Sequence, residues 1–125
     1  QTYDEEKQKL RQQAMNTLGE CKTKVGASDE DIQAIVNKQL PTTKAGLCML
    51  ECGFSTVGIM TNGKLDSANT LKILAPALSK NEDKSKKVTE ALNNCEKEVG
   101  NGGADGCETA KLIAECFKKE SMKSA

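Results

Sequence analysis

Apolar residues recur at helical spacing along most of the 125-residue chain. The clearest stripe follows residue 81, where apolar side chains stand at positions i, i+3, i+4, i+7 and i+11: Val88, Ala91, Leu92, Cys95 and Val99. This spacing places them on one face of an amphipathic helix. No long stretch alternates apolar and polar residues, and the chain has two Phe, one Tyr and no Trp, so strand signals are absent. The pattern predicts an all-α protein.

Capping and helix-breaking residues give the boundaries of about six predicted helices. They run from Asp4 to Gly19, from Ser28 to a point before Pro41, from about Thr43 to Thr56, from Asp66 through Leu78, from about Asn81 to Gly100, and from Asp105 through Phe117. Ser28, with Asp31 three residues later, resembles a capping box. Pro76 lies inside the fourth helix and should kink or shorten it. The residues at 61–64, Thr-Asn-Gly-Lys, predict a turn.

An even number of cysteines in a short chain predicts a disulfide framework. The six are Cys21, Cys48, Cys52, Cys95, Cys107 and Cys116, and six cysteines allow 15 connectivities. On one helix, Cys48 and Cys52 would have Cβ atoms roughly 6 Å apart, whereas a disulfide needs about 3.8 Å. Cys107 and Cys116 would point to opposite sides of a straight helix. Excluding both pairings leaves ten connectivities, so the framework ties helices together instead of closing local loops.

Length and cysteine content indicate one secreted domain that spans residues 1–125. A chain of this size can bury a core but gains from covalent ties. Persistent disulfides imply an oxidising compartment. The chain opens with QTYDEEKQ, without an initiator Met or an apolar signal region, as expected after signal-peptide removal. No apolar run approaches the ~18 residues of a membrane span.

Charge and the missing residue types argue against several functions. Lys plus Arg equals Asp plus Glu, 18 each, so no net field draws the chain to nucleic acid. It has no His, which excludes Ser-His and Cys-His nucleophiles and His-dependent metal sites. The glycines at 100–106 are not a phosphate loop, because Asp105 replaces the third glycine of G-x-G-x-x-G and no strand precedes it. The lysines at 80–87 are most simply a solvated face. We expect no enzyme, no metal and no cofactor.

The cysteine spacing, C-x26-C-x3-C-x42-C-x11-C-x8-C, resembles that of the insect odorant-binding proteins, the six-cysteine general-odorant and pheromone carriers. The x3 and x8 intervals are the specific part of that pattern. The resemblance implies the pairing Cys21–Cys52, Cys48–Cys107 and Cys95–Cys116, which is one of the ten sets. It also implies helices around an internal apolar cavity, secretion into sensillum lymph or haemolymph, and a membrane odorant receptor as a candidate partner. We expect a monomer or a weak homodimer.

Two sets of residues are candidate walls of that cavity. Positions carried over from the family pattern are Ala14, Leu50, Phe54, Leu92, Ile113 and Phe117. Positions suggested by their helical stripes or apolar character are Leu10, Ile59, Met60, Leu71, Leu74, Leu78 and Val88. Many family members hold a large aromatic residue where this chain has Ala14, so the entrance side should be roomier or reshaped. Ordinary core packing is an equal alternative for each of these residues.

The predicted ligand is small and hydrophobic. A mostly aliphatic pocket favours medium-chain alcohols, aldehydes, ketones or esters over charged or strongly polar molecules. Two alternatives stay open: a carrier of the same fold for a lipid, hormone or plant metabolite in non-olfactory tissue, and a structural or defensive disulfide-rich protein that binds nothing. No residue distinguishes olfactory from other tissue, but ligand binding distinguishes both carriers from the third hypothesis.

Overall fold

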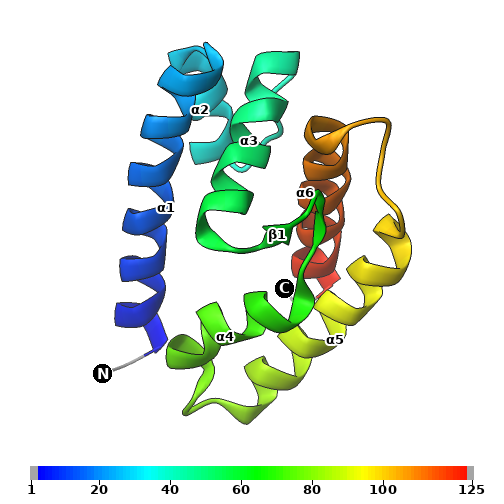
Figure 1. Cartoon of the computed structure of the whole chain (residues 1–125). Coiled ribbons are helices and arrows are strands. Elements are labelled where there is room, and N and C mark those ends of the chain that lie inside the picture. The colour runs from blue at the N-terminus through cyan, green and yellow to red at the C-terminus, as the bar shows by residue number, and fades with distance from the viewer. Residues whose placement is uncertain (1–2, 124–125) are drawn as a thin grey trace.

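A computed structural model of the chain describes residues 3–123, which form six helices and one small hairpin (Figure 1). The helices are α1 (Tyr3–Val25), α2 (Asp29–Val36), α3 (Lys44–Val57), α4 (Ser67–Leu78), α5 (Glu82–Val99) and α6 (Gly106–Lys123). The strands are β1 (Met60–Thr61) and β2 (Lys64–Leu65). The all-α prediction with six helices is confirmed. Within the described residues, no helix combines the length and apolar character needed to cross a membrane.

Side chains cap the helices where the sequence predicts. Ser28 precedes α2 and forms a complete capping box with Asp31. Thr43, Asp66 and Asn81 precede the next three helices, and each side chain accepts a hydrogen bond from the backbone N–H three residues later. These bonds satisfy N–H groups that have no partner inside the helix. Local chemistry therefore fixes where α2, α3, α4 and α5 begin.

The predicted end of the first helix at Gly19 is wrong, because α1 continues to Val25. A glycine inside a helix costs roughly 1 kcal/mol relative to alanine. Leu18 and Cys21 are both buried on the inner side of this segment, and their burial offsets that cost. The helix ends just before Gly26, whose φ of +73° is easily adopted only by a residue without a side chain.

Two other helix ends refine the prediction. Asp4 lies within the first turn of α1 rather than before it, where its negative charge still complements the helix dipole. Pro76 lies in the last turn of α4, and the helix ends two residues later at Leu78. Pro76 and Lys72, whose carbonyl loses its helical partner there, are both exposed, so water can replace the missing bond.

A short hairpin between α3 and α4 contradicts the expectation of no strands. Met60 pairs with Leu65 and Thr61 with Lys64 in an antiparallel ladder. Asn62 and the following glycine have φ values of +54° and +76°, the signature of a two-residue hairpin turn. The predicted turn is thus confirmed, and two-residue strands are too short to leave an alternating pattern. The hairpin places Met60 in the core, where it is buried.

Three disulfides connect four of the helices. Cys21–Cys52 joins α1 to α3, Cys48–Cys107 joins α3 to α6, and Cys95–Cys116 joins α5 to α6. No described cysteine is free. The pairing implied by the family resemblance is confirmed, and neither excluded linkage occurs. Helices α2 and α4 contain no cysteine, so packing and hydrogen bonds alone hold them.

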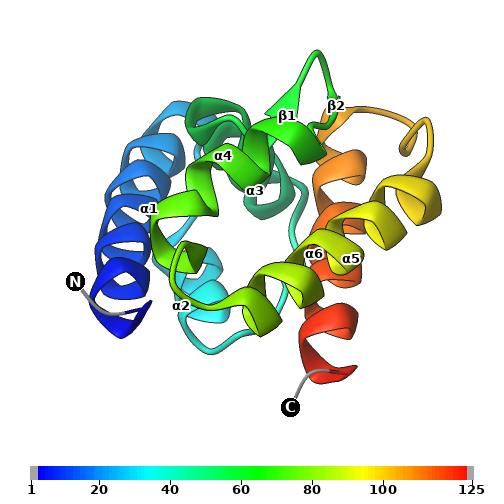
Figure 2. The same cartoon turned by 90° about the horizontal axis from the view of Figure 1, so that it is seen from below.

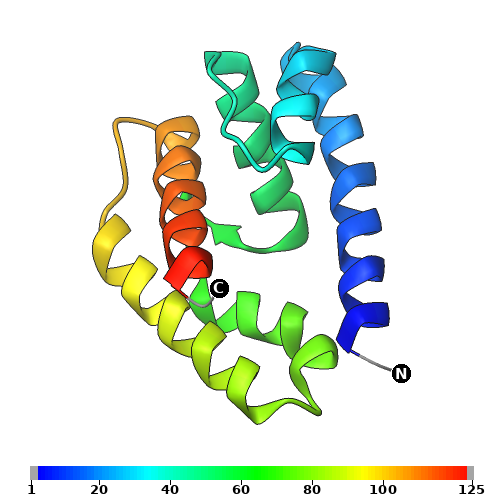
Figure 3. The same cartoon turned by 180° about the vertical axis from the view of Figure 1, so that it is seen from behind.

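The densest packing lies along α3, which α1 flanks on one side and α6 on the other (Figures 1 and 3). Buried side chains between α3, the hairpin, the end of α5 and α6 include Leu47, Leu50, Met60, Val99, Ala110 and Ile113. A second buried group between α1 and α3 contains Leu18, Cys21 and Met49. Helices α4 and α5 cross at the other end of the molecule, between the start of α1 and α6 (Figure 2).

A buried carboxylate attaches α2 to α3. The Asp31 side chain accepts a hydrogen bond from the Ser28 backbone N–H at 3.0 Å and another from the Thr43 hydroxyl at 2.9 Å. These donors, the backbone N–H foremost, hold the pKa of Asp31 below its ordinary value although burial opposes them. Asp31 therefore links the cap of one helix to the cap of the next, without a covalent bond.

Candidate functional site

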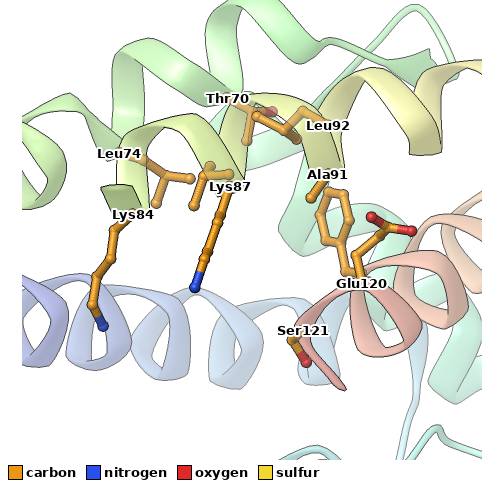
Figure 4. A pocket seen from close by; sticks show the side chains of 10 residues that line it. Thr70, Leu74, Lys84, Lys87, Ala91, Leu92, Glu120 and Ser121 are labelled. Carbon is orange, nitrogen blue, oxygen red and sulfur yellow. The ribbon is translucent and has the colours of Figure 1, made fainter. Parts of the chain in front are cut away.

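A pocket of about 290 Å³ lies between α4, α5 and α6 (Figure 4). Its apolar wall consists of Leu74, Val88, Ala91, Leu92 and Phe117. Its polar lining consists of Thr70, Lys84, Lys87, Glu120 and Ser121. The volume is close to the lower end of the roughly 300–1,000 Å³ that small-molecule sites span. A small, largely apolar molecule therefore suits this space.

One face of α5 supplies half of the lining. Lys84, Lys87, Val88, Ala91 and Leu92 are spaced i, i+3, i+4, i+7 and i+8, which aligns them along one side of the helix. Two residues of α4, at positions 70 and 74, are four residues apart and so also lie on one side of their helix, where they line the pocket. Residues 117, 120 and 121 complete the lining from α6. The pocket is thus the space that three amphipathic faces leave between them.

Phe117 is held in place by its covalent neighbour. Cys116 is buried and bonded to Cys95, so α6 is fixed to α5 one residue before the ring. The Phe117 ring centre lies 6.5 Å from that of Phe54, with an angle of 52° between the planes, a tilted arrangement that aromatic pairs favour. Phe54 supports Phe117 from α3 and does not itself line the pocket.

Glu120 is a carboxylate in the pocket wall whose charge is already compensated. It is 8 % exposed and accepts hydrogen bonds from the Lys123 ammonium at 2.7 Å and from the Asn94 side-chain amide at 3.2 Å. These two bonds, that of Lys123 first, hold the pKa of Glu120 below its ordinary value. Because Asn94 belongs to α5 and Glu120 to α6, the contact also joins the two helices beside the pocket.

The two pocket lysines extend from α5 toward the interior of the ring of helices. Figure 4 shows their side chains leaving α5 on the same side, the one that faces α1. Among residues 3–123, no hydrogen bond or ion pair engages the Lys87 ammonium. The two hydroxyls of the lining are occupied locally: Thr70 donates to the Asp66 carbonyl at 2.7 Å, and Ser121 donates to the Lys118 carbonyl at 3.0 Å.

Four of the thirteen residues predicted to line a cavity lie in this pocket: Leu74, Val88, Leu92 and Phe117. The other nine lie outside its lining. Leu50, Met60 and Ile113 belong to the buried packing along α3, and Phe54 packs against it. Leu78 is buried at the end of α4, while Ile59, Leu71 and Leu10 are half-buried and Ala14 is exposed. A role for any of the thirteen in ligand binding remains a prediction.

The polar part of the lining was not predicted from the sequence. Lys84 and Lys87 are exposed, as predicted for a solvated face, but they also line the pocket beside Val88 and Ala91. The signal that could have found them is the i, i+3, i+4 spacing itself, extended to charged positions. The same extension from Phe117 reaches Glu120 and Ser121. Long lysine stems commonly cover apolar surface while the charged end stays in water.

The arrangement provides a space with an apolar wall. Thr70 and Ser121, the two hydroxyls of the lining, both donate to backbone carbonyls and so are not directed at a base. Within the described part of the chain, no cluster of three or more His, Cys, Asp or Glu side chains is placed to hold a metal ion. Binding an apolar molecule is the chemistry that this geometry supports.

Comparison with known proteins agrees with the fold. The model of the PBP/GOBP family matches residues 4–120. General odorant-binding protein 28a of Drosophila melanogaster is 32% identical over 110 residues, which cover 87% of this chain and 76% of that protein.

Two solved structures share the fold as well as part of the sequence. Odorant-binding protein dmelOBP28a from Drosophila melanogaster has a TM-score of 0.78 at 32% identity and covers 95% of this chain and 97% of its own. The fatty acid binding protein OBP56a from the oral disk of the blowfly Phormia regina has a TM-score of 0.70 at 28% identity, covering 92% and 94%. The resemblance seen in the cysteine spacing is therefore confirmed, and the chain belongs to the PBP/GOBP family.

Proposed function

We propose that this protein is a secreted, non-catalytic carrier that holds a small hydrophobic ligand in the pocket between α4, α5 and α6. The observation that carries the proposal is the apolar wall of that pocket, about 290 Å³ in volume, in a chain of this family. Transfer of a ligand from water to such a wall is favourable by roughly 25 cal/mol per Å² of apolar surface removed from water. The Cys95–Cys116 crosslink holds α5 to α6 beside this space, which side chains leave unfilled.

The proposed ligands are medium-chain alcohols, aldehydes, ketones or esters. The wall is aliphatic apart from Phe117, so a flexible saturated chain can cover it. In our proposal the protein carries its ligand through sensillum lymph or haemolymph and delivers it to a membrane receptor. It does so as a monomer or a weak homodimer. A fatty acid carrier outside olfactory tissue is the second candidate, since one structural relative is described as a fatty acid binding protein.

A displacement experiment with the neutral fluorescent probe N-phenyl-1-naphthylamine tests the proposal. The competing ligands are 1-decanol, decanal, 2-decanone and ethyl octanoate. Saturable probe binding that each ligand reverses is the expected result. The variant Ala91→Trp places a large ring in the pocket and should weaken binding at least about tenfold. Absence of probe binding in folded wild-type protein would favour a structural or defensive role and overturn the proposal.

A matched variant controls for the added ring. Asn93→Trp introduces the same side chain two residues later on an exposed part of α5, outside the lining, and should bind as the wild type does. Because the natural chain has no Trp, each variant also gains a single fluorophore. Quenching or a spectral shift on adding 1-decanol is expected for the ring at 91 and not for the ring at 93.

A further inference from the structure

We propose that the pocket also takes amphiphiles with a carboxylate head and a saturated chain of medium length, and that the Lys87 ammonium holds the head. The inference rests on the proposed carrier function and deepens it by naming the residue that would select ligands with a carboxylate head. It differs from the expectation drawn from the sequence, in which charged ligands are disfavoured.

The position of Lys87 carries the first step. It precedes Val88 and lies one turn from Ala91 on the face of α5 that forms the pocket, so its stem runs beside the apolar wall. Figure 4 shows its side chain pointing from α5 toward α1, on the pocket side of the helix. Within the described residues, no carboxylate pairs with it. A ligand can therefore lay its chain along the wall and present an anion to this group.

The charges around the pocket carry the second step. Lys84 stands one turn before Lys87 and adds a second positive charge to the same rim. The carboxylate of the lining, Glu120, is already neutralised by Lys123 at 2.7 Å and hydrogen-bonded by Asn94. The charge of the Lys87 ammonium is therefore not compensated by the carboxylate of the lining, and it attracts an anion and repels a cation.

Solvent exposure carries the third step. The side chains of Lys84 and Lys87 are exposed, so a carboxylate at this rim keeps part of its water and avoids the large cost of burying a charge. Ion pairs in such surroundings are weak, worth a factor of about two to five in affinity. Lys87 selects among ligands that already bind through their apolar chains.

Decanoate and 1-decanol, which have chains of equal length, test the inference through displacement of N-phenyl-1-naphthylamine at pH 7.5 in low salt. Lys87→Gln should weaken decanoate about two- to fivefold and change 1-decanol less than about twofold. Lys86→Gln is the matched control. It removes the same charge one residue earlier, outside the pocket lining, and should leave the ratio of the two affinities unchanged. Salt near 0.5 M should shrink the effect of Lys87→Gln.

Charge reversal provides the second arm. Lys87→Glu should weaken decanoate further and strengthen decylamine, which carries the opposite charge on the same chain. An unchanged decanoate-to-decanol ratio in Lys87→Gln, or an equal loss in Lys86→Gln, would overturn the assignment of Lys87. If 1-decanol binds but the decanoate-to-decanol affinity ratio does not change in Lys87→Gln, the carrier function stands and this inference alone fails. If neither ligand displaces the probe, the carrier function fails as well.

Discussion

The contact between α3 and α6 and the contact between α4 and α5 use similar side chains but are stabilised differently. The first, here the α3–α6 junction, contains the Cys48–Cys107 disulfide and the fully buried Ile113. The second, here the α4–α5 corner, has no disulfide to α4, and Leu74 and Val88 are only partly buried there. A hydrogen bond of 3.4 Å from the Ser67 hydroxyl to the Leu92 carbonyl spans the corner.

The difference indicates a division of roles within one small domain. Side chains in the α3–α6 junction meet other side chains on all sides, which gives the dense packing typical of protein interiors. Side chains in the α4–α5 corner face a pocket and so lack contacts on one side. Stability should therefore depend mainly on the junction and ligand affinity mainly on the corner.

The largest expected effect is on stability, and it separates the two regions directly. Ile113→Ala should lower the free energy of unfolding by about 2–5 kcal/mol, because it leaves a cavity in dense packing. Leu74→Ala should cost less than about 1.5 kcal/mol, since that side chain already borders a void. Urea titrations with unchanged slopes would measure both values. Equal losses in the two variants would contradict the division of roles.

The second effect is on affinity and compares the two phenylalanines. Phe117→Ala should weaken binding of 1-decanol by about 1–3 kcal/mol, the scale of burying one large apolar side chain. Phe54→Ala should weaken it by less, because Phe54 supports Phe117 from outside the lining. Displacement titrations on folded variants provide the measurement. An unchanged affinity in Phe117→Ala would remove this ring from the site.

The smallest effect is the response to acid. The chain has no His, so no side chain with an ordinary pKa titrates between pH 5 and 8. The pKa of Glu120 lies below its ordinary value, chiefly because Lys123 donates to it. The contribution of the charged Glu120 to the stability of the pocket wall is therefore complete above about pH 4.5 and is lost as pH falls through the lowered pKa. Binding of 1-decanol should be flat from about pH 7.5 to 5.5 and fall, if at all, below about 5.

A neutral replacement shows whether Glu120 is responsible for any acid response. Glu120→Gln retains an acceptor for Asn94 but loses the charge that pairs with Lys123. The acid response of 1-decanol binding should disappear in this variant, while affinity at pH 7 should change only slightly. A midpoint between about pH 6 and 7 in the wild type would show that another carboxylate, with a raised pKa, controls binding.

Local chemistry explains why much of the fold could be predicted from the sequence. Ser28, Asp66 and Asn81 are recognisable caps, because the bond that each makes involves residues three positions apart. The end of α1 could not be predicted in this way. Gly19 is a poor helix residue on its own, and its helical conformation depends on burial of Leu18 and Cys21 against another helix. That contact is not visible in the local sequence.

The pocket was harder to predict because an apolar stripe does not reveal what it faces. Ile113 and Val88 occupy equivalent positions in their stripes, yet one is fully buried in the α3–α6 junction and the other borders an empty volume. The distance between neighbouring helices decides which outcome occurs, and that distance depends on the whole fold. Lys87 is exposed, as predicted for a solvated face, and its place in the pocket lining depends on the neighbouring helices α4 and α6.

The order of the crosslinks along the chain has a consequence for the response of the protein to proteolysis. The spans 21–52, 48–107 and 95–116 overlap in succession. A single backbone cut anywhere between Cys21 and Cys116 therefore leaves both pieces covalently joined. Cleavage in the connection between α4 and α5, at residues 79–81, would separate no fragment, because Cys48–Cys107 still links the two parts. A nicked molecule would keep its mass on a non-reducing gel and every helix that surrounds the pocket.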